Sequence, residues 1–216
     1  MKRLAWLLLA AATPVAAQRP DLAGRLAGRV PAAVIPVVQS LSDSAVAHGL
    51  PVEPLFQKAI EGGAKGVPAE RISAALQTVF VQLDGAAKAI RSGGASADVE
   101  SITAGAFSLA AGLDSGQVRD LVRASLRANA TAVTLRVSGM LTALGVPGAK
   151  VVALVSATLQ AGGQPGDVLA LPGRVQDGIA HGERPEQAAE GLARAAAARV
   201  DGGLGHGRGR TNPHRP

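Results

Sequence analysis

The sequence contains no cysteine and no tyrosine, and only one tryptophan and three phenylalanines among its 216 residues. Without cysteine the chain has no disulfide, no thiolate metal site and no cysteine nucleophile. Aromatic residues make up 2% of the chain, which leaves few rings for stacking on bases or for enclosing a cation. Hydrophobic residues still make up 47%, so we expect an aliphatic core in which alanine and glycine let helices approach closely.

The net charge of +6 is concentrated at the two ends of the chain. Each end contributes +2, from Lys2 and Arg3 at the first, and from Asp201, Arg208, Arg210 and Arg215 at the second. Residues 18–200 therefore carry only +2, so the basic balance does not predict nucleic-acid binding.

Residues 1–17 have the three parts of a secretory signal peptide. Lys2 and Arg3 precede the apolar run Leu4–Ala12, Pro14 follows it, and small residues lead up to Gln18. The apolar run is shorter than the roughly 20 residues that a membrane-spanning helix needs. We expect an exported, secreted or periplasmic protein without a transmembrane span once the signal is cleaved, and an uncleaved anchor is the alternative.

Residues 49–91 carry the clearest helical pattern in the chain. Leu55, Phe56, Ala59 and Ile60 form a stripe at helical spacing, and Gly62-Gly63 is expected to stop that helix. Beyond Pro68 a longer stripe runs from Ile72 to Ile90, over roughly five turns of 3.6 residues. The sequence thus predicts a short helix, a tight turn and a long helix.

Similar stripes fill the rest of residues 18–200 and predict one all-helical domain. The main ones are Val34, Val37, Val38, Leu41 and Ala45; Val99, Ile102, Ala106 and Leu109; Val118, Leu121, Val122, Ser125 and Leu126; Val133, Val137, Met140, Leu141 and Leu144; Val151, Val152, Leu154, Val155 and Leu159; and Val168, Leu169, Leu171, Val175 and Ile179. The last helix, over residues 183–200, has few large apolar residues and is expected to be peripheral. Residues 201–216 have no stripe, and we expect a disordered basic tail rich in glycine, arginine and proline.

Several residues are expected to start or interrupt these helices. The expected N-caps are Ser96 for one helix and Asp114 or Ser115 for the next. Breaks are expected at Asn129–Thr131 and at Pro172-Gly173. Pro36 is either tolerated in a first turn or kinks its helix.

Glycines in seven turns share a loose spacing to the apolar residue that follows, which suggests internal repetition. These turns begin at Gly49, Gly66, Gly94, Gly112, Gly145, Gly163 and Gly182. Their intervals pair into periods of 45–51 residues, a range that overlaps the two-helix repeats of about 40–47 residues. The fold is therefore expected to consist of stacked helical hairpins or, alternatively, to be an irregular helical bundle.

The sequence contains few residues that could serve in catalysis or metal binding. His48 and His181 each precede a glycine helix stop and are expected to satisfy terminal carbonyls rather than bind metal, while His206 and His214 lie in the tail. The densest mixed charges form a first-turn cluster that is expected to be solvated, with Glu61 and Lys65 as an i,i+4 pair. Its members are Glu53, Lys58, Glu61, Lys65, Glu70 and Arg71.

No Gly-x-Ser-x-Gly elbow or phosphate-binding loop occurs, so the sequence predicts no catalytic, cofactor or metal residues. It favours a non-enzymatic interaction or structural protein whose partner is a protein or a component of the cell envelope, and it does not indicate an oligomeric state. The alternative is an exported enzyme that uses carboxylates such as Glu53, Glu61 or Glu70 in a helical cleft.

Overall fold

The computed structural model describes residues 22–205, and the side chains of residues 24–200. Within that part of the chain the regular structure is helical and contains no strand, which confirms the all-α prediction. Residues 1–17, expected to be the signal, lie outside the described residues, as do residues 206–216 of the expected tail.

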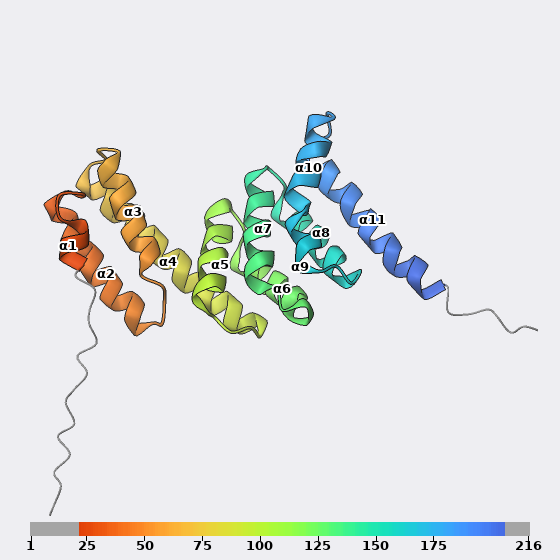
Figure 1. Ribbon diagram of the computed structural model, residues 1–216, viewed down its shortest axis with the longest axis horizontal. Coiled ribbons are helices and arrows are strands. Elements are labelled where there is room, and N and C mark those ends of the chain that lie inside the picture. The colour runs from red at the N-terminus through yellow and green to blue at the C-terminus, as the bar shows by residue number, and fades with distance from the viewer. Residues whose placement is uncertain (1–21, 206–216) are drawn as a thin grey trace, which may run out of the picture.

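The helices follow one another with short connections (Figure 1). They are α1 (Leu22–Leu26), the 3-10 helix η1 (Ala32–Val34), α2 (Ile35–Ala47), α3 (Glu53–Ala64), α4 (Ala69–Gly93), α5 (Val99–Ala111), α6 (Ser115–Ser125), the 3-10 helix η2 (Leu126–Ala128), α7 (Thr131–Ala143), α8 (Gly148–Gln160), α9 (Pro165–Leu169), α10 (Leu171–Ala180) and α11 (Pro185–Gly205). Helix α11 thus includes the first five residues that were assigned to the tail.

Most helices end in the same way, with a left-handed residue followed by an apolar one. Apart from the residue after Gly28, the residue that follows each left-handed position donates its N–H to the carbonyl five residues earlier, as Leu50 does to Ala45 (2.8 Å) and Val146 does to Leu141 (3.2 Å). This is the Schellman motif, in which glycine accepts a positive φ without steric cost. Six of the seven turn glycines expected from the sequence have a positive φ, and the seventh position is Gly162 rather than Gly163. Asn129 (φ 47°) ends η2 in the same way.

The predicted helix starts are confirmed in part. Asp114 caps α6, because its Oδ1 accepts the N–H of Gln117 (2.8 Å), whose side chain in turn accepts the N–H of Asp114. The cap of α5 is Asp98, which accepts the N–H of Ser101 (2.8 Å), and not Ser96. Pro36 is tolerated as the second residue of α2.

Two predicted breaks were placed wrongly. Helix α3 continues through Gly62 and Gly63 to Ala64. A methyl group at Gly63 would lie 2.1 Å from the carbonyl oxygen of Arg29, so this glycine is needed for close packing rather than for stopping the helix. In the second case α9 ends at Leu169 and α10 begins at Leu171, so that Pro172 falls in the first turn of α10.

From α4 onward, alternate helices pack side by side. Helices α4, α6, α8 and α11 form one series of contacts, and α5, α7 and the pair α9–α10 form the other. A methyl group at Gly105 of α5 would lie 3.5 Å from Leu135 of α7, and one at Gly139 of α7 would lie 3.2 Å from Ser108 Cα of α5. Contacting positions therefore recur about 30 residues apart, close to the 33–34 residues of short two-helix repeats, and not at the predicted 45–51 residues.

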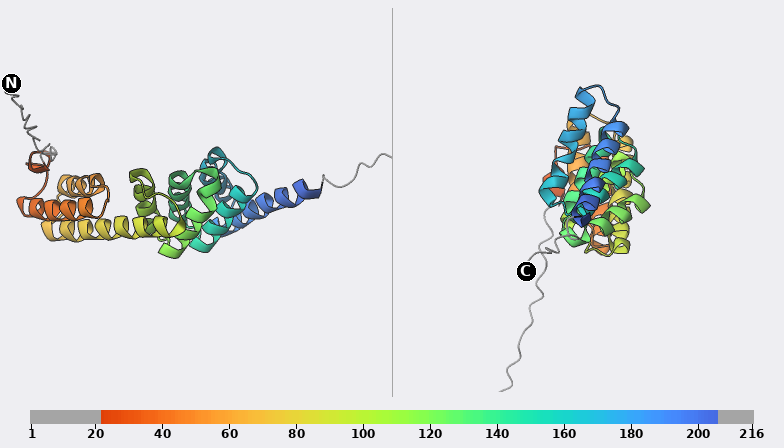
Figure 2. Two further views of the ribbon diagram at one scale, coloured as in Figure 1. Left: turned by 90° about the horizontal axis from the view of Figure 1, so that it is seen from below. Right: turned by 90° about the vertical axis from the view of Figure 1, so that its right-hand side faces the viewer.

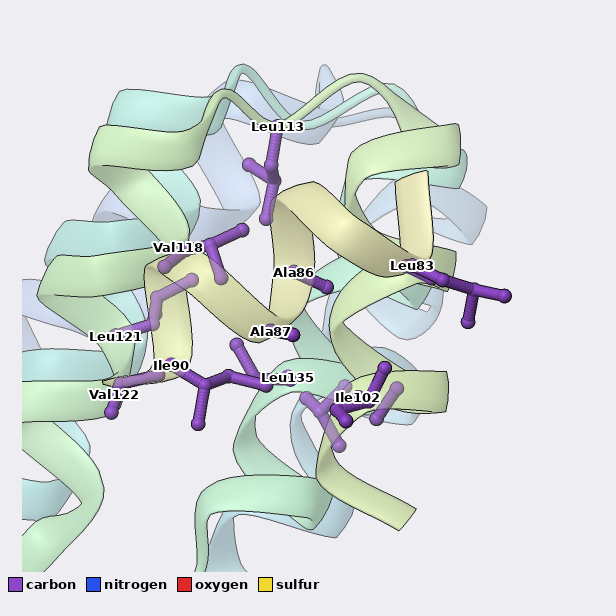
Figure 3. Packing of buried hydrophobic residues seen from close by; sticks show 14 of the residues in the cluster. Leu83, Ala86, Ala87, Ile90, Ile102, Leu113, Val118, Leu121, Val122 and Leu135 are labelled. Atoms are coloured by element: carbon purple, nitrogen blue, oxygen red, sulfur yellow. The ribbon is translucent and has the colours of Figure 1, made fainter. Parts of the chain in front are cut away.

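Helix α4 links two groups of helices in an elongated molecule. Its first half packs against α2 and α3, and its second half packs against α5 and α6. Figure 2 shows α4, in yellow, running along both groups. The core around its second half is aliphatic, as expected, and is formed by Leu83, Ile90, Ile102, Leu121 and Leu135 among others (Figure 3).

Candidate functional site

The structure separates the three carboxylates that were considered for catalysis. Glu53 accepts hydrogen bonds from Arg25 (2.9 and 3.0 Å) and from Gln57 (2.9 Å). Glu61 forms ion pairs with Lys58 and Lys65, which confirms the predicted i,i+4 pair. Glu70 is exposed on α4. A hollow beside the turn from α3 to α4 is lined by Glu61 but not by Glu53 or Glu70.

The electrostatics of Glu53 and Glu61 do not suit acid catalysis. Hydrogen bonds from Gln57 and Arg25 lower the pKa of Glu53, and hydrogen bonds from Lys65 and Lys58 lower the pKa of Glu61. A general acid at neutral pH needs the opposite shift, towards a raised pKa. No observation on these carboxylates therefore favours the cleft enzyme over the binding protein.

The two described histidines differ in their contacts. His181 Nδ1 lies 2.7 Å from the carbonyl oxygen of Asp177 and donates to it, which confirms the predicted capping role. His48 instead faces α4, where its Nδ1 is 3.6 Å from Asp84 Oδ1 and its ring lies against Phe80. The prediction for the His48 ring was wrong because α4 passes the end of α2. His206 and His214 lie outside the described residues, and within residues 24–200 no three His, Asp or Glu side chains gather as metal ligands.

Small residues bring α5 and α7 unusually close together. Gly105 of α5 lies beside Leu135 of α7 and Gly139 of α7 lies beside Ser108 of α5, and the buried hydroxyl of Ser108 donates to the carbonyl oxygen of Leu135. Contacts run from Gly105 beside Leu135 to Gly112 beside Thr142, so the two helices are parallel. Figure 1 shows them as neighbours near the middle of the molecule.

A shallow apolar groove follows the outer seam of these two helices. It has a volume of about 390 Å³ and is lined by Thr103, Ala104 and Phe107 of α5 and by Arg136 and Met140 of α7. Phe107 and Met140 are each 43% exposed. One side of the Phe107 ring packs against Gly139 of α7, where an added methyl group would lie 2.6 Å from it. We call these five residues the α5–α7 groove.

One positive charge belongs to this groove. Arg136 is exposed and forms no ion pair with any side chain of residues 24–200. An apolar groove with one unpaired guanidinium is suited to a ligand that has an apolar face and a carboxylate at its edge.

The stripes read from the sequence did not predict this groove. Val99 and Met140 were assigned to buried stripes, whereas Val99 is 65% exposed and Met140 43% exposed. Phe107 fell outside the predicted stripe of its helix. A signal was therefore present, since one of the three phenylalanines of an aromatic-poor chain occupies a face that the stripe leaves to solvent.

None of the helices within residues 22–205 combines the length and the apolar character that crossing a bilayer requires. Comparison with known protein families, with curated proteins and with solved structures gives no significant match.

Proposed function

We propose that this protein is an exported, non-enzymatic interaction protein that binds an amphipathic helix of a partner protein in the α5–α7 groove. The observation that carries the proposal is the exposed pair Phe107 and Met140 beside the unpaired Arg136. Aromatic residues, methionine and arginine are the residue types enriched at protein interfaces.

A helix fits the shape of the groove better than an extended strand. The groove lies between two parallel helices, and the seam of such a pair accepts the ridge of side chains that a third helix presents every three to four residues. The described residues contain no sheet edge to which a strand could be added.

The charge of Arg136 favours partner helices that carry an acidic residue. Arg136 would form an ion pair with a glutamate or aspartate at the edge of the partner's apolar face. Burial of the exposed part of Phe107 would add about 1 kcal/mol, because full burial of such a side chain contributes about 1.5–3 kcal/mol. A groove of this size supports weak binding, with a dissociation constant on the order of 10–100 µM.

The test uses a fluorescently labelled synthetic peptide and the chain from residue 18 onward. The peptide is a helix with leucines three and four residues apart and a glutamate beside them, and its binding is followed by fluorescence anisotropy. We expect saturable binding that Phe107→Ser weakens by about tenfold, equivalent to 1.4 kcal/mol. Val81→Ser is the matched control, because Val81 is 67% exposed on α4 and does not line the groove. Absence of binding, or an equal loss for both variants, would contradict the proposal.

Export is a separate part of the proposal, supported by the three-part pattern of residues 1–17. Intact-protein mass spectrometry of the chain made in a bacterial host tests it. We expect a mature chain that begins at Gln18 in the exported fraction. A chain that keeps Met1 and remains with the membranes would instead show that the segment is an anchor.

A further inference from the structure

A second hollow lies near the end of the described chain, far along the sequence from the α5–α7 groove. It is enclosed by the end of α8, by α9 and by the facing sides of α10 and α11, which Figure 1 shows together at one end of the molecule. The short helix α9, which contacts both α7 and α8, contributes one residue to its lining.

Two arginines from different helices line this hollow. Arg174 comes from α10 and Arg199 from α11, and neither forms an ion pair with a side chain in residues 24–200. The hollow also contains one acid, Asp167 of α9, whose Oδ2 accepts the backbone N–H of Gln164 (2.8 Å). Asp167 therefore has a structural role at the start of α9, and it lies outside ion-pair distance of both guanidinium groups.

The remaining walls of the hollow include two leucines, a hydrogen-bonded threonine and the backbone at the end of α8. Leu171 is buried and Leu192 is half-buried. The Thr158 hydroxyl donates to the carbonyl oxygen of Leu154 (2.9 Å), so its proton is not available to a ligand. The free donors that the side chains offer are thus those of the two arginines.

We propose that this hollow, the two-arginine pocket, binds an oxyanion group of a small molecule, a carboxylate or a phosphate. Both arginines are exposed and line the same hollow, so an anion in it would be attracted by the two positive charges together. Guanidinium groups present paired N–H donors that match the oxygens of carboxylate and phosphate. Leu171 and Leu192 leave room beside the anion for a short aliphatic part.

Isothermal titration calorimetry on the chain from residue 18 onward tests the pocket with two probes, inorganic phosphate and butyrate, at constant ionic strength. Binding of phosphate alone supports a phosphate site, binding of butyrate alone supports a carboxylate site, and binding of both supports a general oxyanion site. Absence of binding heat from both probes at about 10 mM overturns the proposal, because even a site with a dissociation constant of about 1 mM would be mostly occupied at that concentration.

Substitutions test whether the probes bind in the two-arginine pocket. We expect Arg174→Gln and Arg199→Gln each to weaken binding by about tenfold. Asp167→Asn should tighten binding, because it removes a repelling charge while its amide oxygen still accepts the N–H of Gln164. Damage to the fold would lower the affinity, so this opposite sign separates the two effects. Arg127→Gln on η2 is the control, because Arg127 is also exposed and forms no ion pair within residues 24–200. An equal loss for Arg127→Gln would show non-specific charge attraction and overturn the proposal.

Discussion

At the scale of single residues, hydrogen bonds from side chains on neighbouring turns and helices lower the pKa values of four carboxylates. Hydrogen bonds lower the pKa of Glu53 (from Gln57 and Arg25), Asp84 (from Lys88), Glu61 (from Lys65 and Lys58) and Glu190 (from Lys150). Two of these interactions join separate helices, since Arg25 connects α1 to α3 and Lys150 connects α8 to α11.

These shifts predict loss of stability in acid. A carboxylate with a lowered folded-state pKa stabilises the fold above its unfolded value, near 4, and loses that contribution as the pH falls through the lower folded value. The urea midpoint, followed by circular dichroism, should therefore stay level from about pH 7 to 5 and fall between about pH 4.5 and 3. Glu53→Gln should reduce the size of that fall. An unchanged midpoint at pH 3 would contradict this account.

A buried hydroxyl without a partner gives a second prediction at this scale. Thr134 is fully buried on α7, and its Oγ1 forms no hydrogen bond within the described residues. Thr134→Val keeps the shape and removes the cost of the unpaired hydroxyl, so it should raise the free energy of unfolding by about 1 kcal/mol. Thr158→Val is the control, because the Thr158 hydroxyl donates to Leu154. Urea unfolding should show a gain for the first variant and none for the second.

At the scale of helices and turns, glycine has two different roles in this chain. At Gly66 it permits a left-handed backbone (φ 63°), and at Gly63 it permits close contact between backbones. The sequence shows both as a glycine in an expected turn. Only the path of residues 29–30 past α3 tells them apart, and no local pattern encodes that path.

A pair of substitutions isolates the effect of backbone conformation. Neither Gly66 nor Gly173 has an atom within 4 Å of an added methyl group, so the two positions differ chiefly in φ. Gly66→Ala should lower the free energy of unfolding by about 1–2 kcal/mol, the cost of a left-handed residue with a side chain. Gly173→Ala, inside α10, should raise it by about 0.5–1 kcal/mol. Equal effects in thermal or urea unfolding would contradict the assigned turn.

Close packing at α3 gives a third stability test. Gly63→Ala would place a methyl group 2.1 Å from the carbonyl oxygen of Arg29, and backbone cannot yield as a flexible side chain does. We expect a loss of about 2–3 kcal/mol in the free energy of unfolding. Gly191→Ala in α11 is the matched control, since its methyl group would meet open space and should be neutral or stabilising. A neutral Gly63→Ala would mean that α3 stops earlier, as the sequence suggested.

At the scale of the whole molecule, the sequence predicted the aliphatic composition of the core but not where hollows form on the surface. Aliphatic stripes at helical spacing predicted most of the buried side chains of α4 and α6, but Leu126 and Leu169, which were also assigned to stripes, are 44% and 55% exposed. The stripes could not show that helices whose residues lie about 30 positions apart in the sequence become neighbours in space, because this contact depends on how hairpins pack on one another. The α5–α7 groove and the two-arginine pocket both arise from such packing.

Binding of an amphipathic helix in the α5–α7 groove is the main proposal, and reversing the charge of Arg136 tests it. Fluorescence anisotropy would compare the glutamate-bearing helical peptide with an otherwise identical lysine-bearing peptide, on the native chain and on Arg136→Glu. We expect the native chain to prefer the glutamate peptide and Arg136→Glu, a substitution of an exposed side chain, to prefer the lysine peptide, each by several-fold. The same preference for both proteins, or no preference for either, would contradict the proposal.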